Sequence, residues 1–255
     1  MRVVILAGGL GSRISEETYL RPKPMVTIGD KPMLWHIMKK FAKHGLTDFV
    51  ICLGYKGEVI KEYFLNFRSF NSSLRTNTSS GEVKILDEDH LDWKVTLIDT
   101  GTSSNTGERL KRAQKYLSEE SFFFTYGDGL TDQNLLATAS FHKEKGKLVT
   151  LTAVNPPARY GAVSVNSGIV TSFSERTSSP DSLINGGYFI VNPNIFETLD
   201  RLSNPSWEVD VLPKLAMEGN LAAFEHTGFW FAMDTLRDKE HLENLLENGS
   251  APWLK

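Results

Sequence analysis

The sequence predicts an α/β fold, in which helices flank a mainly parallel sheet and a smaller mixed sheet follows in the second half. Short apolar runs alternate with amphipathic helical patterns over residues 1–155, and this alternation is typical of βαβ units. Later in the chain the pattern changes to short strands around turn residues. No repeat or polar linker interrupts the chain, so we expect a single domain over 1–255 with two parts, about 1–155 and about 156–255.

The first elements can be placed by their apolar patterns. Residues 2–7 (RVVILA) form a continuous apolar run that ends in glycines, which is typical of a strand buried on both faces. Helical spacing of apolar residues follows over 31–45, a strand over 48–54 and a second helix over 58–67. Residues 68–92 are polar and have little pattern, so they form either a long loop or an inserted hairpin.

The alternation continues beyond this insertion. The expected strands are 93–100, 121–129 and 148–154, and the helices between them are 106–117 and 134–146. The strand at 121–129 ends in an aspartate between two glycines.

The second part favours shorter strands. Two strands are expected within 161–175, around the turn Asn166-Ser-Gly. The other expected elements are strands at 186–191, 221–226 and 228–233 and helices at 194–202, 207–218 and 235–249.

The composition excludes several classes of protein. A formal net charge of −3 argues against a general nucleic-acid binder, so any anion site must be a local basic pocket. No apolar run reaches the roughly 18 residues of a membrane span. The single cysteine, Cys52, excludes an intramolecular disulfide and favours a reducing compartment. We therefore expect a cytoplasmic protein that binds neither nucleic acid nor membrane.

The stretch LAGGLGSRISEETYLRPKPM (6–25) points to an anion site. Its glycines follow a buried strand, where backbone N–H groups can approach a phosphate. The dinucleotide fingerprint fails at Ile14, and no Gly-Lys-Ser/Thr of a P-loop follows. A plain tight turn stays possible. However, Arg13 and Lys23 supply cations, and flanking prolines hold the lysine backbone stiffly.

The motifs GYKG, VTLIDTG, TGERLKR, FTYGDGLTD, INGGYFIVNP, WEVDVLPKLA and MDTLRDK follow the glycine stretch in order. Together they resemble the sugar-1-phosphate nucleotidyltransferases, and within them the glucose-1-phosphate cytidylyltransferase branch. The resemblance runs from residue 3 to the terminal APW, and only 68–92 lacks a counterpart. It implies a Rossmann-like nucleotide-diphospho-sugar transferase fold, with a nucleotide-binding part at about 1–155, a sugar-phosphate-binding part at about 156–255 and a homo-oligomer.

The implied reaction is the attack of a sugar-1-phosphate oxygen on the α-phosphorus of CTP. With α-D-glucose 1-phosphate and Mg²⁺, it yields CDP-glucose and pyrophosphate. A phosphate monoester is mostly dianionic at neutral pH, so the protein need not supply a nucleophile or a base. What it must supply is charge neutralisation and in-line positioning.

The resemblance also assigns roles to single residues. The implied catalytic cations are Lys23 and Arg13, and the implied Mg²⁺ ligands are Asp128 and Asp234. The implied nucleotide-binding residues are Leu6, Gly8, Gly9, Gly11, Ser12, Arg13, Lys23, Arg109 and Asp128. The implied sugar-phosphate-binding residues are Tyr126, Tyr160, Gly161, Glu175, Arg176, Asn185 and Gly186.

Plainer interpretations of several of these residues stay open. Asp128 could form a turn, and Asp234 could cap a helix. Arg109 could belong to a solvated helix face, and Trp230 could either wall the sugar or belong to the core.

Departures from the family pattern leave substrate choice open. Glu108 stands at a position where the family prefers glycine, Ala158 replaces a glycine, and Phe231-Ala232 replaces a polar residue and a proline. Arg176 replaces the lysine of a Glu-Lys-Pro motif. The same chemistry with another nucleotide or sugar 1-phosphate is therefore one alternative. A catalytically idle sugar-nucleotide-binding protein is another, although Lys23, Asp128 and Asp234 argue against it.

Overall fold

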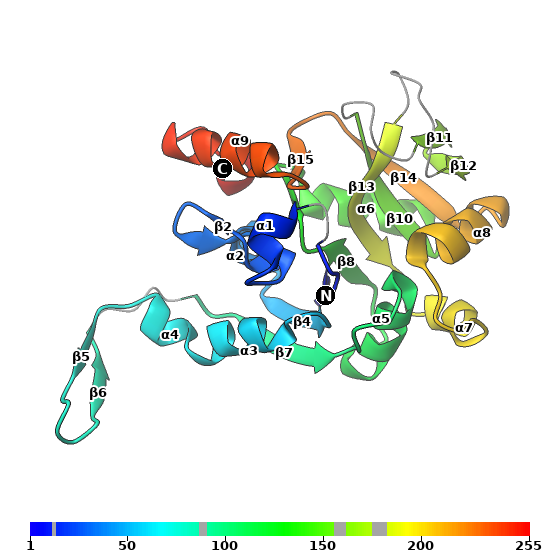
Figure 1. Cartoon of the computed structure of the whole chain (residues 1–255). Helices are drawn as coiled ribbons and strands as arrows, with labels where there is room; N and C mark the ends of the chain where they lie inside the picture. The colour runs from blue at the N-terminus through cyan, green and yellow to red at the C-terminus, as the bar shows by residue number, and fades with distance from the viewer. Residues whose placement is uncertain (12–13, 87–90, 156–161, 175–182) are drawn as a thin grey trace.

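The computed structural model describes residues 1–11, 14–86, 91–155, 162–174 and 183–255, and these fold into a large mixed sheet between two layers of helices (Figure 1). The strands of this sheet are β1 (Val3–Ala7), β4 (Asp48–Leu53), β7 (Lys94–Asp99), β8 (Phe122–Tyr126), β10 (Val149–Val154), β11 (Ala162–Asn166), β12 (Ile169–Ser174), β13 (Leu183–Val191) and β14 (Leu221–His226). Within the described residues, these nine strands lie in the order β10-β14-β12-β11-β13-β8-β1-β4-β7.

The first part of the chain forms the parallel portion of the sheet. β1 lies between β4 and β8 and pairs with both in parallel, and β7 adds to β4 in parallel. Parallel strands need crossover connections, and the helices expected between them supply these. The α/β prediction is therefore confirmed, and the carboxyl ends of β1, β4, β7 and β8 lie at one edge.

The remaining strands extend the same sheet mainly through antiparallel pairs. β13 pairs with β8, and β10 and β11 pair with β13, all antiparallel, whereas β14 pairs with β10 in parallel. The hairpin expected around Asn166-Ser-Gly is present as β11 and β12, with Ser167 and Gly168 at φ values of 50° and 78°. These left-handed conformations suit a tight hairpin turn.

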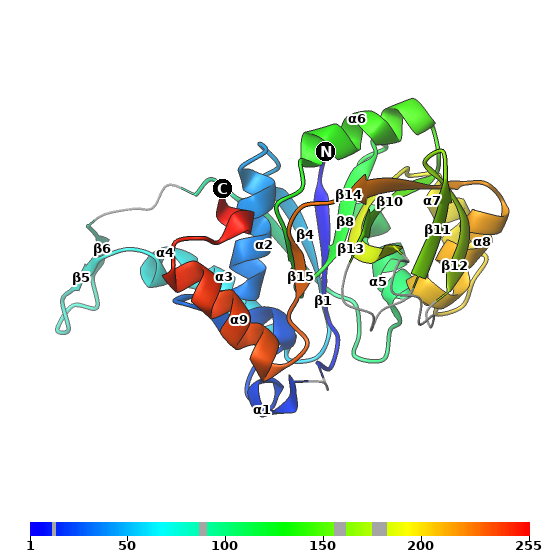
Figure 2. The same cartoon turned by 90° about the horizontal axis from the view of Figure 1, so that it is seen from above.

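The helical segments cover both faces of the sheet (Figure 2). The α-helices are α1 (Ser15–Thr18), α2 (Met33–Ala42), α3 (Gly57–Leu65), α4 (Phe67–Phe70), α5 (Thr106–Ala113), α6 (Leu135–Lys145), α7 (Ile195–Asp200), α8 (Leu212–Met217) and α9 (Leu236–Glu247). Short 3₁₀ segments are η2 (Lys23–Met25), η3 (Gln114–Tyr116) and η5 (Pro252–Leu254), and η4 (Trp207–Val211) is a π-helix. The helix expected at 207–218 therefore begins with a wider turn.

Two apolar cores separate the sheet from its helices. Because side chains alternate along a strand, Val4 and Leu6 of β1 enter one core while Val3 and Ile5 enter the other. The first core packs under α5, α7 and α8, and the second packs under α2, α3 and α9 (Figure 2). Burial on both faces explains why β1 has a continuous apolar sequence.

Three small sheets complete the described structure: β2 (Thr27–Ile28) with β3 (Lys31–Pro32), β5 (Leu74–Thr76) with β6 (Val83–Ile85), and β9 (Gly129–Thr131) with β15 (Trp230–Ala232). The β5–β6 hairpin extends away from the body of the molecule (Figure 1). The hairpin alternative for 68–92 is therefore correct for its described residues. No helix in the described ranges is long and apolar enough to span a membrane.

The strand expected at 121–129 is divided at Gly127-Asp128 into β8 and β9. A Cβ at Gly127 would lie 2.6 Å from Pro24 Cγ and 2.9 Å from the Leu6 carbonyl oxygen. Only glycine allows the chain to pass this close to β1 and η2. The break places Asp128 at the carboxyl end of the parallel strands.

Candidate active site

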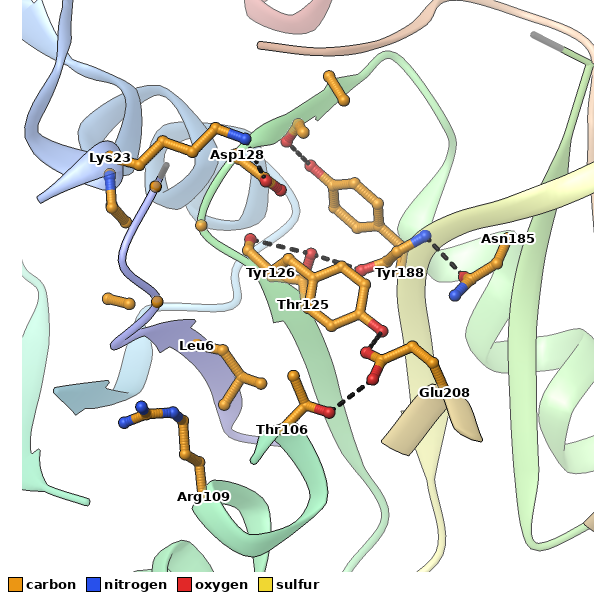
Figure 3. Close-up of a pocket in the computed structure, with 18 of the residues that line it drawn as sticks. Leu6, Lys23, Thr106, Arg109, Thr125, Tyr126, Asp128, Asn185, Tyr188 and Glu208 are labelled. Atoms are coloured by element: carbon orange, nitrogen blue, oxygen red, sulfur yellow. Dashed lines mark hydrogen bonds and ion pairs between the residues drawn. The ribbon is translucent and has the colours of Figure 1, made fainter. Parts of the chain in front are cut away.

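A cavity of about 570 Å³ opens at the carboxyl ends of β1 and β8. Its wall includes the last residues of both strands, the glycine loop, the start of α5 and parts of β13 and η4 (Figure 3). Open α/β sheets bind ligands at this edge. The expected sites Leu6, Gly9 and Gly11 all line it.

The glycine loop packs directly on the predicted catalytic lysine. Gly11 has a φ of +64°, and a Cβ there would lie 2.7 Å from Thr18 Cγ2 and 3.1 Å from Lys23 Cβ. Both its conformation and its surroundings therefore require glycine. Gly8 is buried beside Arg109 and, unlike Gly9 and Gly11, does not line the cavity. Ser12 and Arg13 lie outside the described residues.

Lys23 sits at the start of η2, directly after Pro22, whose φ of −67° fixes the entering backbone. Its Nζ donates to Asp128 Oδ2 and to Asp234 Oδ1, at 2.7 Å in both cases, and its side chain is only 11% exposed. Burial alone would lower the pKa of Lys23, but the two carboxylates outweigh this effect and raise it. The lysine is therefore a firmly held cation.

The small β9–β15 sheet brings the two aspartates together, although 105 residues separate them in sequence. β15 is antiparallel to β9, with Ala232 opposite Gly129, and the Met233 amide donates to the Asp128 carbonyl at 2.9 Å. Both aspartates therefore lie at the same end of this ribbon and accept from Lys23. Figure 3 shows the contact between Lys23 and Asp128. Asp128 is not merely a turn former.

The interpretation of Asp234 as a helix cap is wrong. The cap of α9 is Thr235, whose side chain accepts from the Asp238 amide, while the Asp238 carboxylate accepts from the Asp234 and Thr235 amides. This capping box serves the helix terminus. The Asp234 carboxylate instead accepts from Lys23.

The donor set suits a hard divalent cation. One carboxylate oxygen of Asp128 and one of Asp234 each lie 2.7 Å from Lys23 Nζ, and both aspartates line the cavity. Mg²⁺ is usually held by one or two carboxylates together with substrate phosphates and water. In the described ranges, no group of three or more His, Cys, Asp or Glu residues could hold a metal by itself. The two aspartates thus fit a metal that also binds substrate.

Arg109 is buried rather than solvated, so the alternative of a solvated helix face is wrong for this residue. Only 4% of it is exposed, although the neighbouring Arg112 is exposed. Its guanidinium donates to the carbonyls of Gly8 at 3.0 Å and Gly101 at 2.8 Å, and to Thr100 Oγ1 at 2.8 Å. Arg109 therefore ties the glycine loop to the end of β7, and it also lines the cavity.

The expected sugar-phosphate residues that the structure describes lie along the cavity wall formed by β8 and β13. Tyr126, Asn185 and Gly186 all line it. Trp230 lines it too, and its Nε1 donates to the Gly186 carbonyl at 2.6 Å, which favours a wall over core packing. Tyr160, Gly161, Glu175 and Arg176, like Ala158, lie outside the described residues.

Sequence reasoning missed a polar group at the other end of the cavity. Glu208 accepts from the Tyr126 hydroxyl, from Thr106 Oγ1 at 2.6 Å and from Ser206 Oγ at 3.0 Å (Figure 3). Burial, and then the Glu208 carboxylate, raise the pKa of Tyr126 well above its ordinary value, so the phenol stays a donor. The WEVDV motif was the available signal, but helical periodicity does not reveal which of its side chains faces a cavity.

Comparison with known proteins adds independent information. The "Nucleotidyl transferase" family matches residues 2–238. The "Glucose-1-phosphate cytidylyltransferase" of Salmonella typhimurium is 51% identical over 254 residues, covering 99% of this chain and 98% of that protein. The "Probable glucose-1-phosphate cytidylyltransferase" of Bacillus subtilis is 42% identical, covering 99% of both chains. Among solved structures, HddC from Yersinia pseudotuberculosis superposes with a TM-score of 0.77 at 25% identity, covering 96% of this chain and 99% of that chain.

Proposed function

The chain belongs to the nucleotidyl transferase family, and we propose that it transfers a cytidylyl group from CTP to α-D-glucose 1-phosphate. The products are CDP-glucose and pyrophosphate. The observation that carries this proposal is the 51% identity to the Salmonella glucose-1-phosphate cytidylyltransferase, which extends over 99% of the chain. The cavity supports it, because its position and its charged residues suit phosphoryl chemistry.

In the proposed reaction, an oxygen of the sugar phosphate forms a bond to the α-phosphorus of CTP. The bond from that phosphorus to the oxygen bridging to the β-phosphate breaks, and pyrophosphate leaves. Leu6, Gly8, Gly9, Gly11, Ser12 and Arg13 are proposed to hold the nucleotide, and Arg109 to brace their loop. Lys23 neutralises the oxygens of the transferred phosphoryl group, where negative charge gathers in the transition state.

Asp128 and Asp234 are the proposed holders of Mg²⁺, which would neutralise phosphate charge while bound. Lys23 contacts both carboxylates at 2.7 Å. We propose that these contacts keep the lysine at the reacting end of the cavity when substrate is absent. Tyr126, Tyr160, Gly161, Glu175, Arg176, Asn185 and Gly186 are proposed to hold the sugar phosphate.

An idle nucleotide-binding protein has no need of this charged arrangement. Lys23 and the two aspartates come from three separate segments and converge on one point. Buried charges are costly to maintain unless they are paired. Retaining a lysine and two carboxylates in a cavity therefore favours catalysis over simple binding.

A pyrophosphate-release assay with four nucleoside triphosphates and several sugar 1-phosphates tests the proposal. CTP with α-D-glucose 1-phosphate should give the highest kcat/KM, and excess EDTA should stop the reaction. A strong preference for UTP would overturn the base assignment, and a preference for another sugar 1-phosphate would overturn the acceptor. Full activity in EDTA would overturn the metal role of Asp128 and Asp234.

We also propose a homo-oligomer that acts in the cytoplasm. The β5–β6 hairpin carries exposed apolar residues, Leu74, Val83 and the adjoining Leu86, on an arm that leaves the body of the molecule (Figure 1). Exposed apolar surface of this kind is typical of an interaction site. The lone Cys52 is buried and suits a reducing compartment. Analytical ultracentrifugation would test the oligomer, and a monomer at micromolar concentration would contradict it.

A further inference from the structure

Among the described residues that line the cavity, Glu208 carries a carboxylate to which the proposed chemistry gives no role. It projects from the π-helix η4 into the cavity, between Tyr126 of β8 and Thr106 at the start of α5 (Figure 3). π-helical turns are rare, and they occur frequently at functional sites. The residue is half-buried, so part of it faces the space that substrates would fill.

The three hydroxyls around Glu208 have their protons directed at it. Thr106 Oγ1 accepts from the Trp207 amide at 2.8 Å, so its own proton is available for Glu208 Oε2. Ser206 Oγ likewise accepts from the Val209 amide at 3.3 Å and donates to Oε2. Tyr126 donates to Oε1. All three neighbours act as donors to the carboxylate.

This arrangement leaves acceptor capacity on one oxygen. A carboxylate offers about four lone-pair positions, two on each oxygen. Oε2 receives two donors, whereas Oε1 receives one, Tyr126, among the residues that the structure describes. A further hydroxyl could therefore donate to Oε1 without displacing any existing bond.

The charge of Glu208 indicates which part of a substrate lies near it. CTP and a sugar phosphate together carry about six negative charges, so a carboxylate next to their phosphates would be repelled unless a cation offset its charge, as Lys23 does for Asp128 and Asp234. Figure 3 shows Glu208 on the far side of the Tyr126 ring from Lys23 and Asp128. Among the described residues, one end of the cavity thus holds Lys23 paired with two carboxylates, and the other end holds a carboxylate whose side-chain partners are neutral hydroxyls. A hydroxyl-bearing ring fits the anionic end.

We propose that Glu208 is a specificity-determining residue, whose carboxylate accepts a hydrogen bond from a hydroxyl of a bound substrate, either of the glucosyl ring or of the ribose. This rests on the proposed function. A bond from a hydroxyl to an ionised acceptor is short and strong. A site built to bind a hydroxyl rejects the analogue that lacks it, because its own polar group is then left unpaired.

The test combines deoxy substrates with Glu208 variants. The substrates are α-D-glucose 1-phosphate lacking one hydroxyl at a time, and CTP lacking its 2′- or 3′-hydroxyl. In the unmodified protein, one analogue should lose at least about tenfold in kcat/KM relative to its parent. In Glu208→Ala, the penalty for that same analogue should shrink to within about twofold, because the acceptor is gone. The analogue concerned identifies the ring that Glu208 contacts.

Two controls separate recognition from bracing. Ser206→Ala removes a donor to Oε2 and leaves Oε1 in place, so it should keep the discrimination even if it lowers the thermal midpoint. Glu218 is an exposed glutamate at the end of α8, and Glu218→Gln should keep both the discrimination and the thermal midpoint. If Glu208→Ala does not fold, Glu208→Met keeps a side chain of similar length without an acceptor oxygen, and it should also lose the discrimination.

Calorimetric binding of CDP-glucose and of its deoxy analogues gives a readout that does not depend on turnover. If the protein is inactive with CTP and glucose 1-phosphate, the proposed function fails, and this binding series still tests Glu208. If each sugar and ribose analogue loses the same factor in affinity in the unmodified protein and in both Glu208 variants, the carboxylate accepts no hydrogen bond from a substrate hydroxyl. That result would overturn the inference.

Discussion

The two ends of the cavity are built on opposite electrostatic plans. At one end, a lysine cation is held between two carboxylates, Asp128 and Asp234, each at 2.7 Å. At the other, the Glu208 carboxylate is surrounded by neutral hydroxyls from Tyr126, Thr106 and Ser206. The Lys23 end suits stabilisation of the negative charge that develops in a transition state. The Glu208 end suits the binding of substrate hydroxyls that take no part in the reaction. The ends should therefore differ in which kinetic constant they control.

Loss of Lys23 should have the largest effect on catalysis. We expect Lys23→Ala to lower kcat at least about a hundredfold, equivalent to about 2.7 kcal/mol, because the cation would act mainly in the transition state. The variant should also unfold at a lower temperature in EDTA, since Asp128 and Asp234 then face each other without a cation, and Mg²⁺ should restore part of the loss. Steady-state kinetics and thermal unfolding would check both effects.

Lys31 offers a matched control for that variant. It pairs with Asp30 at 3.4 Å and with Asn71, away from Lys23. Lys31→Ala should leave kcat within about twofold, because Lys31 does not line the cavity. A Lys23→Ala variant with unchanged kcat would place the chemistry elsewhere.

Removing one carboxylate at the same end should have the next largest effect. Asp234→Asn keeps the side-chain shape but removes a charge, so we expect at least a tenfold lower kcat/KM and a higher Mg²⁺ concentration for half-maximal activity, about tenfold. Calorimetric titration of the metal in the presence of CTP would measure the shift directly. The control is Asp132→Asn, because Asp132 follows β9 but pairs with His226 at 2.9 Å and does not line the cavity. Equal Mg²⁺ dependence in both variants would count against the metal role.

The charged end could be predicted from the sequence, because the family resemblance assigns roles to Lys23, Asp128 and Asp234. Local backbone restrictions support two of these positions, since Lys23 lies between prolines and Asp128 between glycines, but nothing local marks Asp234. The alternation of strands and helices was also predictable, because both cores impose apolar periods on their elements.

Glu208 could not be predicted, although its partner Tyr126 was expected to bind the sugar phosphate, because the contacts of Glu208 with Tyr126 and Thr106 form only in the folded chain. Glu208 meets Thr106 and Tyr126 across 102 and 82 residues of sequence. The pairing of β9 with β15 could not be predicted either, because strands of three residues are too short to show an alternating apolar pattern. Helical periodicity did not determine which face of α5 carries Arg109. It also gave no sign that backbone carbonyls would accept from its guanidinium.

Arg109 lines the cavity without belonging to either charged cluster, and its effect should be intermediate. Arg109→Lys keeps a cation but loses the planar fork that reaches both Gly8 and Gly101. We expect about 1–3 kcal/mol less free energy of unfolding, since buried carbonyls lose their donors, together with a higher KM for CTP. Urea unfolding and kinetics with CTP varied would measure these. Arg112→Lys, on the exposed face of α5, should change stability by less than about 0.5 kcal/mol, and equal losses in the two variants would refute the bracing role.

The smallest effect concerns pH, and it should arise outside both ends of the cavity. Trp253 Nε1 donates to His36 Nδ1 at 3.1 Å, so Nε2 carries the proton and donates to the Ile28 carbonyl at 3.0 Å. Burial lowers the pKa of His36, although the Ile28 carbonyl acts against it, and burial also lowers the pKa of His142. Neither histidine lines the cavity.

Both rings are therefore held neutral in the folded chain, while the unfolded chain takes up protons at the ordinary histidine pKa of about 6.5. Below that pH the unfolded state binds more protons than the folded state. The free energy of unfolding should therefore be highest above pH 7, and it should fall as pH decreases from about 6.5 towards the lowered folded-state pKa values. Urea unfolding between pH 5.5 and 7.5 would measure this slope.

His36→Gln should lower stability at neutral pH, because the ring that joins Trp253 to Ile28 is lost, and it should also flatten the slope. His241→Gln, at an exposed position on α9, should leave the slope unchanged. A stability that rises on acidification over this range would show that the buried rings are charged in the folded chain.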